Sequence, residues 1–346
     1  MRWQILPAAR FAGYASRWAE LHEAGPAAPM LAPAFVAALL DGFGDGSELL
    51  ALCEQDGRLC AAAVLTPQGP GRWATFQPAQ APLGLWLQRP GLDTDALLDG
   101  LVRALPGFAL LLGLTQCDPL LLPRPADGGR LGSLDYIATA HIDVAGSFDA
   151  YWNARGKNLR SNLKKQRNRL ALEGIPTRLE VLDRPAQMAE AVADYARLEG
   201  AGWKARGGSA VLADNAQGRF YRRMLEAFAD QGQARVYRYW FGERLAAMDL
   251  CILERDCIVI LKTAYDETIA GAWSPALLMR EEACRDLFDD GRFARIEFYG
   301  RVMEWHTRWT DAVRTLYHLN HYRWPALARN HAMLQARAAA ATRNGA

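Results

Sequence analysis

Two stretches of this chain have the pattern of an antiparallel hairpin, and the two resemble each other. In the first, the apolar run 49–53 reaches a turn at Asp56-Gly57 and returns over 58–65. In the second, the run 234–240 reaches a turn at Gly242 and returns over 244–253. Both return runs begin Arg-Leu-x-Ala, and glycine suits each turn because it tolerates positive φ. The separation is too large for a solenoid, so the repeat predicts two copies of one domain.

Length and composition agree with two globular domains. The chain has 346 residues, 51% of them hydrophobic, and a net charge of +2, which excludes a general electrostatic nucleic-acid binder. Its first residues lack a signal-peptide core, and the longest apolar run, 107–114, is too short to cross a membrane. We therefore expect a cytoplasmic protein without a membrane span.

The cysteine pattern points away from metal binding and disulfides. None of the six cysteines forms a CxxC pair, and no histidine stands at zinc-ligand spacing from them. We expect buried, reduced thiols and no metal site.

The second hairpin continues into the most informative part of the sequence. A third strand is expected over 257–264, followed by an irregular segment over 265–273 and a helix from Ser274-Pro275 to about Asp289. Serine as N-cap and proline in the first turn are helix-start signals. The helix N-terminus offers unpaired N–H groups and a positive dipole end, which suit a diphosphate. Taken alone, the same pattern also fits a simple helix cap.

The order and spacing of several motifs in this region resemble the GNAT acyltransferases, in particular the CelD-type, FemAB-related domain. The motifs are Lys262-x-x-Tyr265-Asp266, then Ser274-Pro275-Ala276-Leu277-Leu278, then the acidic-aromatic pair Glu297-Phe298. The resemblance covers about 148–322. Ala276 stands where the family usually has glycine, and Trp305-His306 replaces a common Tyr-Lys pair.

The resemblance implies an α/β (α+β) fold of two tandem GNAT-like lobes, with mixed, mostly antiparallel sheets flanked by helices. We place an N-terminal lobe without a donor site at 1–145, the acyltransferase lobe at 146–325, and a terminal helix and tail at 326–346. The implied reaction moves an acyl group, acetyl first of all, from acyl-CoA to an amine or hydroxyl of a small-molecule or glycan acceptor between the lobes. The expected donor site consists of Ala272, Trp273, Ser274, Ala276, Leu277 and Leu278.

The candidate catalytic residues are Asp249, Glu297 and Tyr265. Asp249 interrupts an apolar strand, so it is either a base with a raised pKa or a solvent-facing position. Glu297 is either a base or a structural partner of an arginine other than Arg295. Tyr265 is a candidate acid for the CoA thiolate, against a packing role.

The candidate acceptor residues are Trp203, Lys204, Lys262, Asp266 and Tyr299. Strand alternation puts Lys262 on the face of Ile258 and Ile260, where it meets a substrate anion or forms a surface ion pair with Asp266. Tyr299 is a second candidate acid. His306 is expected at the surface.

A basic segment, 155–169, leaves two further hypotheses open. It carries Lys157, Arg160, Lys164 and Arg167 on one helical face, with Leu159 and Leu163 on another. This is either a solvated helix face or a site for CoA phosphates, an anionic acceptor or tRNA. The alternatives to an acyl-CoA enzyme are accordingly a Fem-type transferase that uses aminoacyl-tRNA and a non-catalytic module that binds an anionic polymer.

Overall fold

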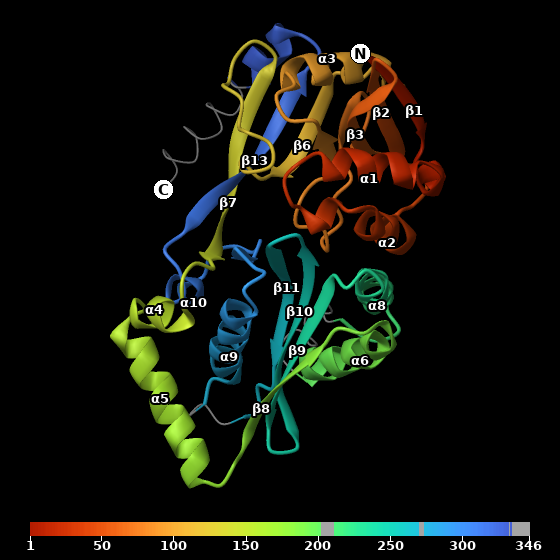
Figure 1. Cartoon of the computed structure of the whole chain (residues 1–346). Helices are drawn as coiled ribbons and strands as arrows, with labels where there is room; N and C mark the ends of the chain where they lie inside the picture. The colour runs from red at the N-terminus through yellow and green to blue at the C-terminus, as the bar shows by residue number, and fades with distance from the viewer. Residues whose placement is uncertain (202–210, 270–272, 332, 334–346) are drawn as a thin grey trace, which may run out of the picture. The chain divides into compact units, whose positions relative to one another are not determined.

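The computed structural model describes residues 1–201, 211–269, 273–331 and 333 (Figure 1). The chain divides into two compact units: unit 1 contains Met1–Ile137 and the segment that begins at Thr315, and unit 2 is Ala138–Arg314. The acyltransferase lobe was expected at 146–325, and residues 146–314 of it lie in unit 2.

Unit 1 is built on a mixed sheet with the order β1-β2-β3-β4-β6-β13, and β5 pairs with β3. The neighbours β4 and β6 are parallel, whereas the β1–β2, β2–β3, β3–β4, β3–β5 and β6–β13 pairs are antiparallel. The strands are β1 (Arg2–Pro7), β2 (Leu49–Gln55), β3 (Arg58–Pro67), β4 (Arg72–Thr75), β5 (Trp86–Gln88), β6 (Leu111–Cys117) and β13 (Val313–Tyr322). Its helices are η1 (Ala8–Tyr14), α1 (Ala15–Glu23), η2 (Pro29–Leu31), α2 (Pro33–Phe43) and α3 (Thr94–Ala104).

Unit 2 repeats this plan with the order β7-β12-β11-β10-β9-β8. Here β11 and β12 are the parallel pair. The strands are β7 (Leu131–Asp143), β8 (Thr177–Leu182), β9 (Ala234–Phe241), β10 (Arg244–Glu254), β11 (Cys257–Tyr265) and β12 (Arg295–Glu297). Only the second half of β7, from Ala138, belongs to unit 2. The helices are α4 (Phe148–Asn153), α5 (Lys157–Leu172), α6 (Pro185–Ala201), α8 (Ala216–Ala229), α9 (Pro275–Asp290) and α10 (Glu304–Thr307). Figure 1 shows α9 on one face of β9–β11 and α6 and α8 on the other.

The expected internal repeat is confirmed by the pairing. In each unit a hairpin is followed by an antiparallel strand, a helix and a parallel strand: β2-β3-β4-α3-β6 in unit 1 and β9-β10-β11-α9-β12 in unit 2. Both hairpin turns use a glycine with positive φ, Gly57 at 75° and Gly242 at 56°. The predicted fold class, two α/β lobes with mixed, mostly antiparallel sheets, is therefore confirmed.

The strand that completes each sheet comes from an unexpected part of the chain. β7 directly follows the unit 1 strands but pairs antiparallel with β12 through Ile142 and Ile296. β13 follows the unit 2 strands but pairs with β6 through Leu319 and Leu114. The sequence prediction placed 313–322 in the second lobe because these residues follow it in the chain. Only the strand pairing shows that β13 joins the sheet of unit 1.

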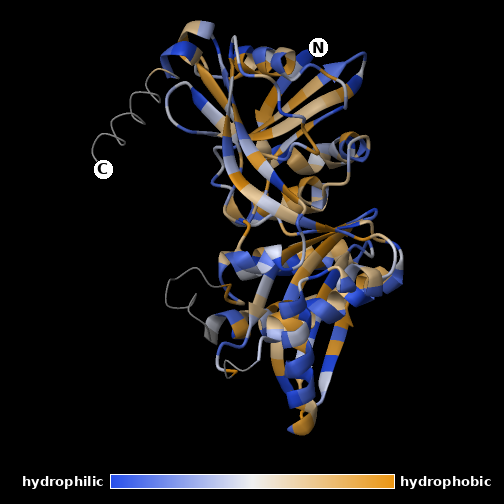
Figure 2. Cartoon of the chain, turned by 90° about the vertical axis from the view of Figure 1, so that its left-hand side faces the viewer, coloured by the Kyte–Doolittle hydropathy of each residue, from blue (hydrophilic) through white to orange (hydrophobic). Residues whose placement is uncertain are grey.

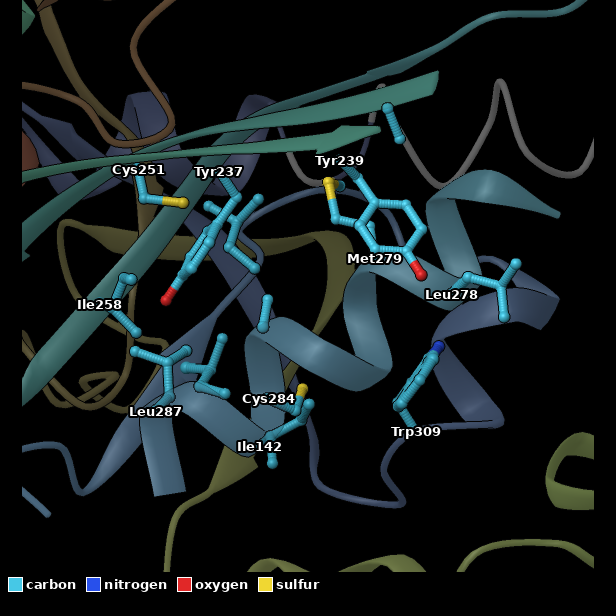
Figure 3. Close-up of a cluster of buried hydrophobic side chains, with 14 of the residues drawn as sticks. Ile142, Tyr237, Tyr239, Cys251, Ile258, Leu278, Met279, Cys284, Leu287 and Trp309 are labelled. Atoms are coloured by element: carbon cyan, nitrogen blue, oxygen red, sulfur yellow. The ribbon is translucent and has the colours of Figure 1, made fainter. Parts of the chain in front are cut away.

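One hydrophobic core of unit 2 lies between the sheet and α9. Figure 3 shows Tyr237 and Ile258 from the strands packed against Met279 and Leu287 of α9. Figure 2 shows hydrophobic residues concentrated in the strands, while the helices alternate hydrophobic and hydrophilic residues. Each fully buried side chain of this size contributes about 1.5–3 kcal/mol to stability.

All six cysteines are free and buried, as the sequence predicted. Burial raises the pKa of the Cys53 thiol to about 12, so it remains protonated and unreactive at neutral pH.

Candidate functional site

The site begins at the first turn of α9, at the start that the sequence predicted. Ser274 is the N-cap residue and Pro275 the first helical residue, but the serine side chain makes no capping hydrogen bond. The backbone N–H groups of Leu277 and Leu278 donate to the Ser274 carbonyl at 2.9 and 3.0 Å. The Ser274 N–H donates to Gln166 Oε1 of α5 at 2.7 Å, so α5 fixes the entry of the chain into this helix.

A cavity of about 720 Å³ opens at this end of α9. Its walls come from the end of β11, the segment before α9, the first turns of α9, and the α10 region. The lining residues are Thr263, Tyr265, Asp266, Glu267, Ile269, Trp273, Ser274, Pro275, Ala276, Leu277, Arg280, Trp305 and Trp309. Among the described residues, Ser274, Ala276 and Leu277 at this helix end border the cavity.

The sheet itself makes room for this cavity. β11 and β12 pair in parallel only from Cys257 and Arg295 to Val259 and Glu297. Beyond these residues β11 continues to Tyr265 whereas β12 has ended. The last residues of β11 therefore have no β12 partner, and Thr263 and Tyr265 line the cavity instead.

A buried ion pair lies next to the cavity. Asp249 of β10 is completely buried, and its carboxylate pairs with Arg280 of α9 at 2.6 Å. Thr263 Oγ1 donates to Asp249 at 2.5 Å and accepts from Arg280 at 3.2 Å. Burial raises the pKa of Asp249, opposed by the Arg280 charge and the two hydrogen bonds. The solvent-facing alternative for Asp249 is wrong, and Thr263 and Arg280, rather than Asp249 itself, face the cavity.

Lys262 does not share a face with Ile258 and Ile260. A β-bulge shifts the register between β10 and β11, so that Leu250 pairs with Lys262 but Cys251 pairs with Ile260. One extra residue reverses the alternation of side chains beyond it. Lys262 consequently lies 4.0 Å from Glu199 of α6 and over the Tyr221 ring of α8, not beside Asp266.

Asp266 and Tyr265 do line the cavity. Asp266 pairs with Arg244 and accepts hydrogen bonds from Thr268. Although burial acts in the opposite direction, these partners hold the pKa of Asp266 below its usual value. Tyr265 is 45% exposed and lines the cavity, so it is not a buried packing residue.

Glu297 and Tyr299 are not among the residues that line the cavity. Glu297 is 2% exposed and pairs with Arg314 at 2.9 Å, an arginine partner other than Arg295 as one of the two hypotheses held. Arg295 also approaches it, at 3.7 Å. The Arg314 guanidinium lies over the Tyr299 ring, 5.2 Å from its centroid.

The donor residues of the sequence prediction divide into three groups. Trp273, Ser274, Ala276 and Leu277 line the cavity. Leu278 is fully buried in the unit 2 core. Ala272, together with the acceptor candidates Trp203 and Lys204, lies outside the described residues.

His306 is not at the surface as expected. It is 4% exposed and stacks on Trp305 with ring centroids 3.5 Å apart, and its Nδ1 accepts the Met303 N–H at 2.9 Å. Burial lowers the pKa of His306 to about 4, so the ring is neutral at physiological pH.

Sequence reasoning missed Thr263, Arg280 and Trp309. A signal for Arg280 was present, because at helical spacing it shares a face with the apolar residues Ala283, Cys284 and Leu287. An arginine on an apolar helix face and an aspartate on an apolar strand are natural partners. For Thr263 and Trp309 the chain gives no comparable signal.

Together, the parallel pair β11 and β12, the helix that follows β11 and the cavity at the start of that helix define an acyltransferase-type α/β domain. Residues 157–307 match the family model described as an acetyltransferase (GNAT) domain. This part of the chain therefore belongs to the GNAT superfamily, and the predicted family is confirmed.

Solved structures share the fold over nearly the whole chain. The C-terminal domain of an Agrobacterium fabrum protein described as a lysylphosphatidylglycerol synthetase has a TM-score of 0.57 and 13% identity, covering 93% of this chain and 95% of that one. FemX has a TM-score of 0.55 and 10% identity, with 93% and 97% covered. A conserved Bacteroides thetaiotaomicron protein of unknown function has a TM-score of 0.56 and 10% identity, with 92% and 99% covered. At these identities the likeness shows the fold alone. No curated protein matches the sequence.

Within the described residues, no helix has the length and apolar character needed to cross a membrane. The same residues contain no group of three or more His, Cys, Asp or Glu side chains able to hold a metal ion.

Proposed function

We propose that unit 2 transfers an acyl group, acetyl first of all, from acyl-CoA to an amine or hydroxyl of a small-molecule or glycan acceptor in the cytoplasm. The cavity of about 720 Å³ at the N-terminus of α9 is the observation that carries this proposal. Its size suits a cofactor arm, and the first turn of α9 carries no acidic residue that would repel a diphosphate.

Each part of the cavity has a role in this reaction. The first turn of α9, at Ser274 and Ala276, would hold the diphosphate, and the end of β11 that has no β12 partner would lie along the pantetheine arm. The exposed Tyr265 hydroxyl is available to protonate the thiolate that leaves when the acceptor attacks the thioester carbonyl.

Asp249 acts in this proposal through Thr263. Its carboxylate is fully buried, so an acceptor in the cavity cannot reach it directly. The Thr263 hydroxyl lines the cavity and donates to Asp249, and Arg280 fixes both groups. A proton from the acceptor would therefore pass to Thr263 while the hydroxyl proton passes to Asp249.

Titration of the whole chain with acetyl-CoA by calorimetry tests the proposal. We expect binding in the micromolar range that Leu277→Glu abolishes, because Leu277 lines the cavity. Leu172→Glu is the matched control, since Leu172 is 88% exposed on α5 and lies outside the cavity lining. Absence of acetyl-CoA and CoA binding in the folded protein would refute the proposal.

The FemX-like fold gives the same experiment a second arm. Binding of aminoacyl-tRNA without binding of CoA would assign the cavity to the Fem-type alternative. In that case the donor changes while the fold and the cavity keep their roles.

A further inference from the structure

A second cavity lies in unit 2, along the basic helix α5. It has a volume of about 480 Å³ and is bounded by the end of α4, one side of α5 and Glu281 of α9. None of the residues that line it also lines the cavity at the start of α9. We call it the α5 groove.

Cationic side chains dominate the α5 groove. Lys157, Arg160, Lys164 and Arg167 line it, and Glu281 is its one acidic lining residue. Arg167 pairs with Glu281 at 2.9 Å and also with Glu282. In the described part of the chain the other three cations form no ion pair, so the groove keeps an excess of positive charge.

Packing of α5 keeps these like charges close together although they repel one another. Leu159, Leu163 and Leu170 are buried in the core of unit 2 and fix which side of α5 faces outward. Arg160 is held further by its own Nε–H, which donates to the Arg155 carbonyl at 3.1 Å. Like charges three and four residues apart destabilise a helix, and Lys157, Arg160 and Lys164 have this spacing. An anion in the groove would turn that repulsion into attraction.

Neutral hydrogen-bonding groups stand among the cations. Asn153, Ser161 and Asn168 line the same cavity, and Trp152 adds an aromatic surface. Several donors around a compact positive centre are the arrangement that binds phosphate oxygens, which need more than one hydrogen bond each. A carboxylate has fewer oxygens to satisfy, and a long polyanion would need charges that continue beyond one groove.

We infer that the α5 groove binds the phosphate or diphosphate group of a phosphorylated ligand, at a site separate from the acyl-donor cavity. The inference is independent of the proposed function, because it uses none of the residues that line the donor cavity. It assigns the basic helix a specific site in place of a solvated surface.

Two adjacent lysines allow a matched test. Lys164 lines the groove, whereas the neighbouring Lys165 is also exposed on α5 but lies outside the lining. Inorganic pyrophosphate is titrated into the full-length protein and into the variants Lys164→Glu and Lys165→Glu, which have the same net charge. We expect Lys164→Glu to weaken binding at least about tenfold and Lys165→Glu to weaken it less than about twofold. Equal losses in the two variants, or no binding by the folded wild-type protein, would overturn the inference.

Competition with CoA separates the two cavities. Pyrophosphate bound in the α5 groove should remain bound when CoA is saturating. Displacement by CoA, together with loss of CoA affinity in Lys164→Glu, would make the groove part of the donor site and overturn the separate assignment.

A final pair of probes identifies the source of the phosphate. A lipid headgroup is indicated if the protein sediments with phosphatidylglycerol vesicles but not with phosphatidylcholine vesicles. In that case Lys164→Glu should abolish the sedimentation and Lys165→Glu should preserve it. Pyrophosphate binding without vesicle binding would indicate a soluble phosphorylated molecule. Binding of tRNA that both variants weaken equally, without a pyrophosphate site, would refute the inference in favour of diffuse attraction.

Discussion

Ala276→Asp tests the donor site with little expected effect on folding. Ala276 lies in the first turn of α9 and lines the cavity. An aspartate near a helix N-terminus interacts favourably with the helix dipole by about 0.3–1 kcal/mol, so stability should be unchanged or slightly higher. The same charge repels a bound diphosphate. At about 4 Å and an effective dielectric constant of about 20, one pair of charges repels by about 4 kcal/mol. Because the cavity is open to solvent, we take about half of that value, which corresponds to roughly 30-fold weaker CoA binding.

Calorimetric titration with CoA and thermal unfolding measure the two effects on the same sample. Gln217→Asp is the control, because it puts the same charge in the first turn of α8, whose residues do not line the cavity. We expect Gln217→Asp to leave CoA affinity unchanged. If Ala276→Asp binds CoA as tightly as wild type while the protein remains folded, the diphosphate does not sit at the start of α9, and the reasoning is wrong.

Three further predictions concern the buried charges of unit 2. Arg280→Met should lower the unfolding free energy by about 3–5 kcal/mol because Asp249 is left buried and unpaired, and adding Asp249→Asn should restore part of this loss in urea unfolding. Glu297→Gln should lower stability by about 1–3 kcal/mol without changing CoA affinity, because Glu297 pairs with Arg314 and does not line the cavity; reduced affinity at unchanged stability would instead place it in the site. In the folded state His306 has a pKa of about 4, whereas in the unfolded chain it takes up a proton near pH 6.5. The unfolding free energy should therefore decrease by up to about 3 kcal/mol as the pH is lowered from about 6.5 to about 4. His306→Asn should flatten this part of the pH profile, and an unchanged slope would contradict the assignment.

The parts of the fold that depend on local sequence were predictable. The two hairpins have turn glycines that need positive φ, and the Ser274-Pro275 helix start is set by local backbone chemistry. Those signals placed the start of α9, where the structure has a cavity of about 720 Å³. Four of the six expected donor residues line this cavity as a consequence.

The parts that depend on pairing between distant strands were not predictable. The bulge between Cys251 and Leu250 reverses the facing of Lys262, yet no residue type at that point demands a bulge. Likewise, β7 and β13 each pair outside the unit whose strands precede them in the chain. Alternation of residue types describes one strand, whereas register and partner depend on packing of the whole sheet.

The charges on and around α9 bear on where the proposed anionic donor would bind. Later in the helix, Glu281 and Glu282 pair with Arg167, and Asp286 and Asp290 pair with Arg235, so these acids are compensated. The first turn, by contrast, carries no acid. Of the two carboxylates in the cavity wall, Asp266 is held by Arg244, and Glu267 belongs to the segment after β11 rather than to the helix. The positive dipole end of α9 is therefore left uncompensated within its own helix, which is the condition under which an incoming diphosphate gains most from it.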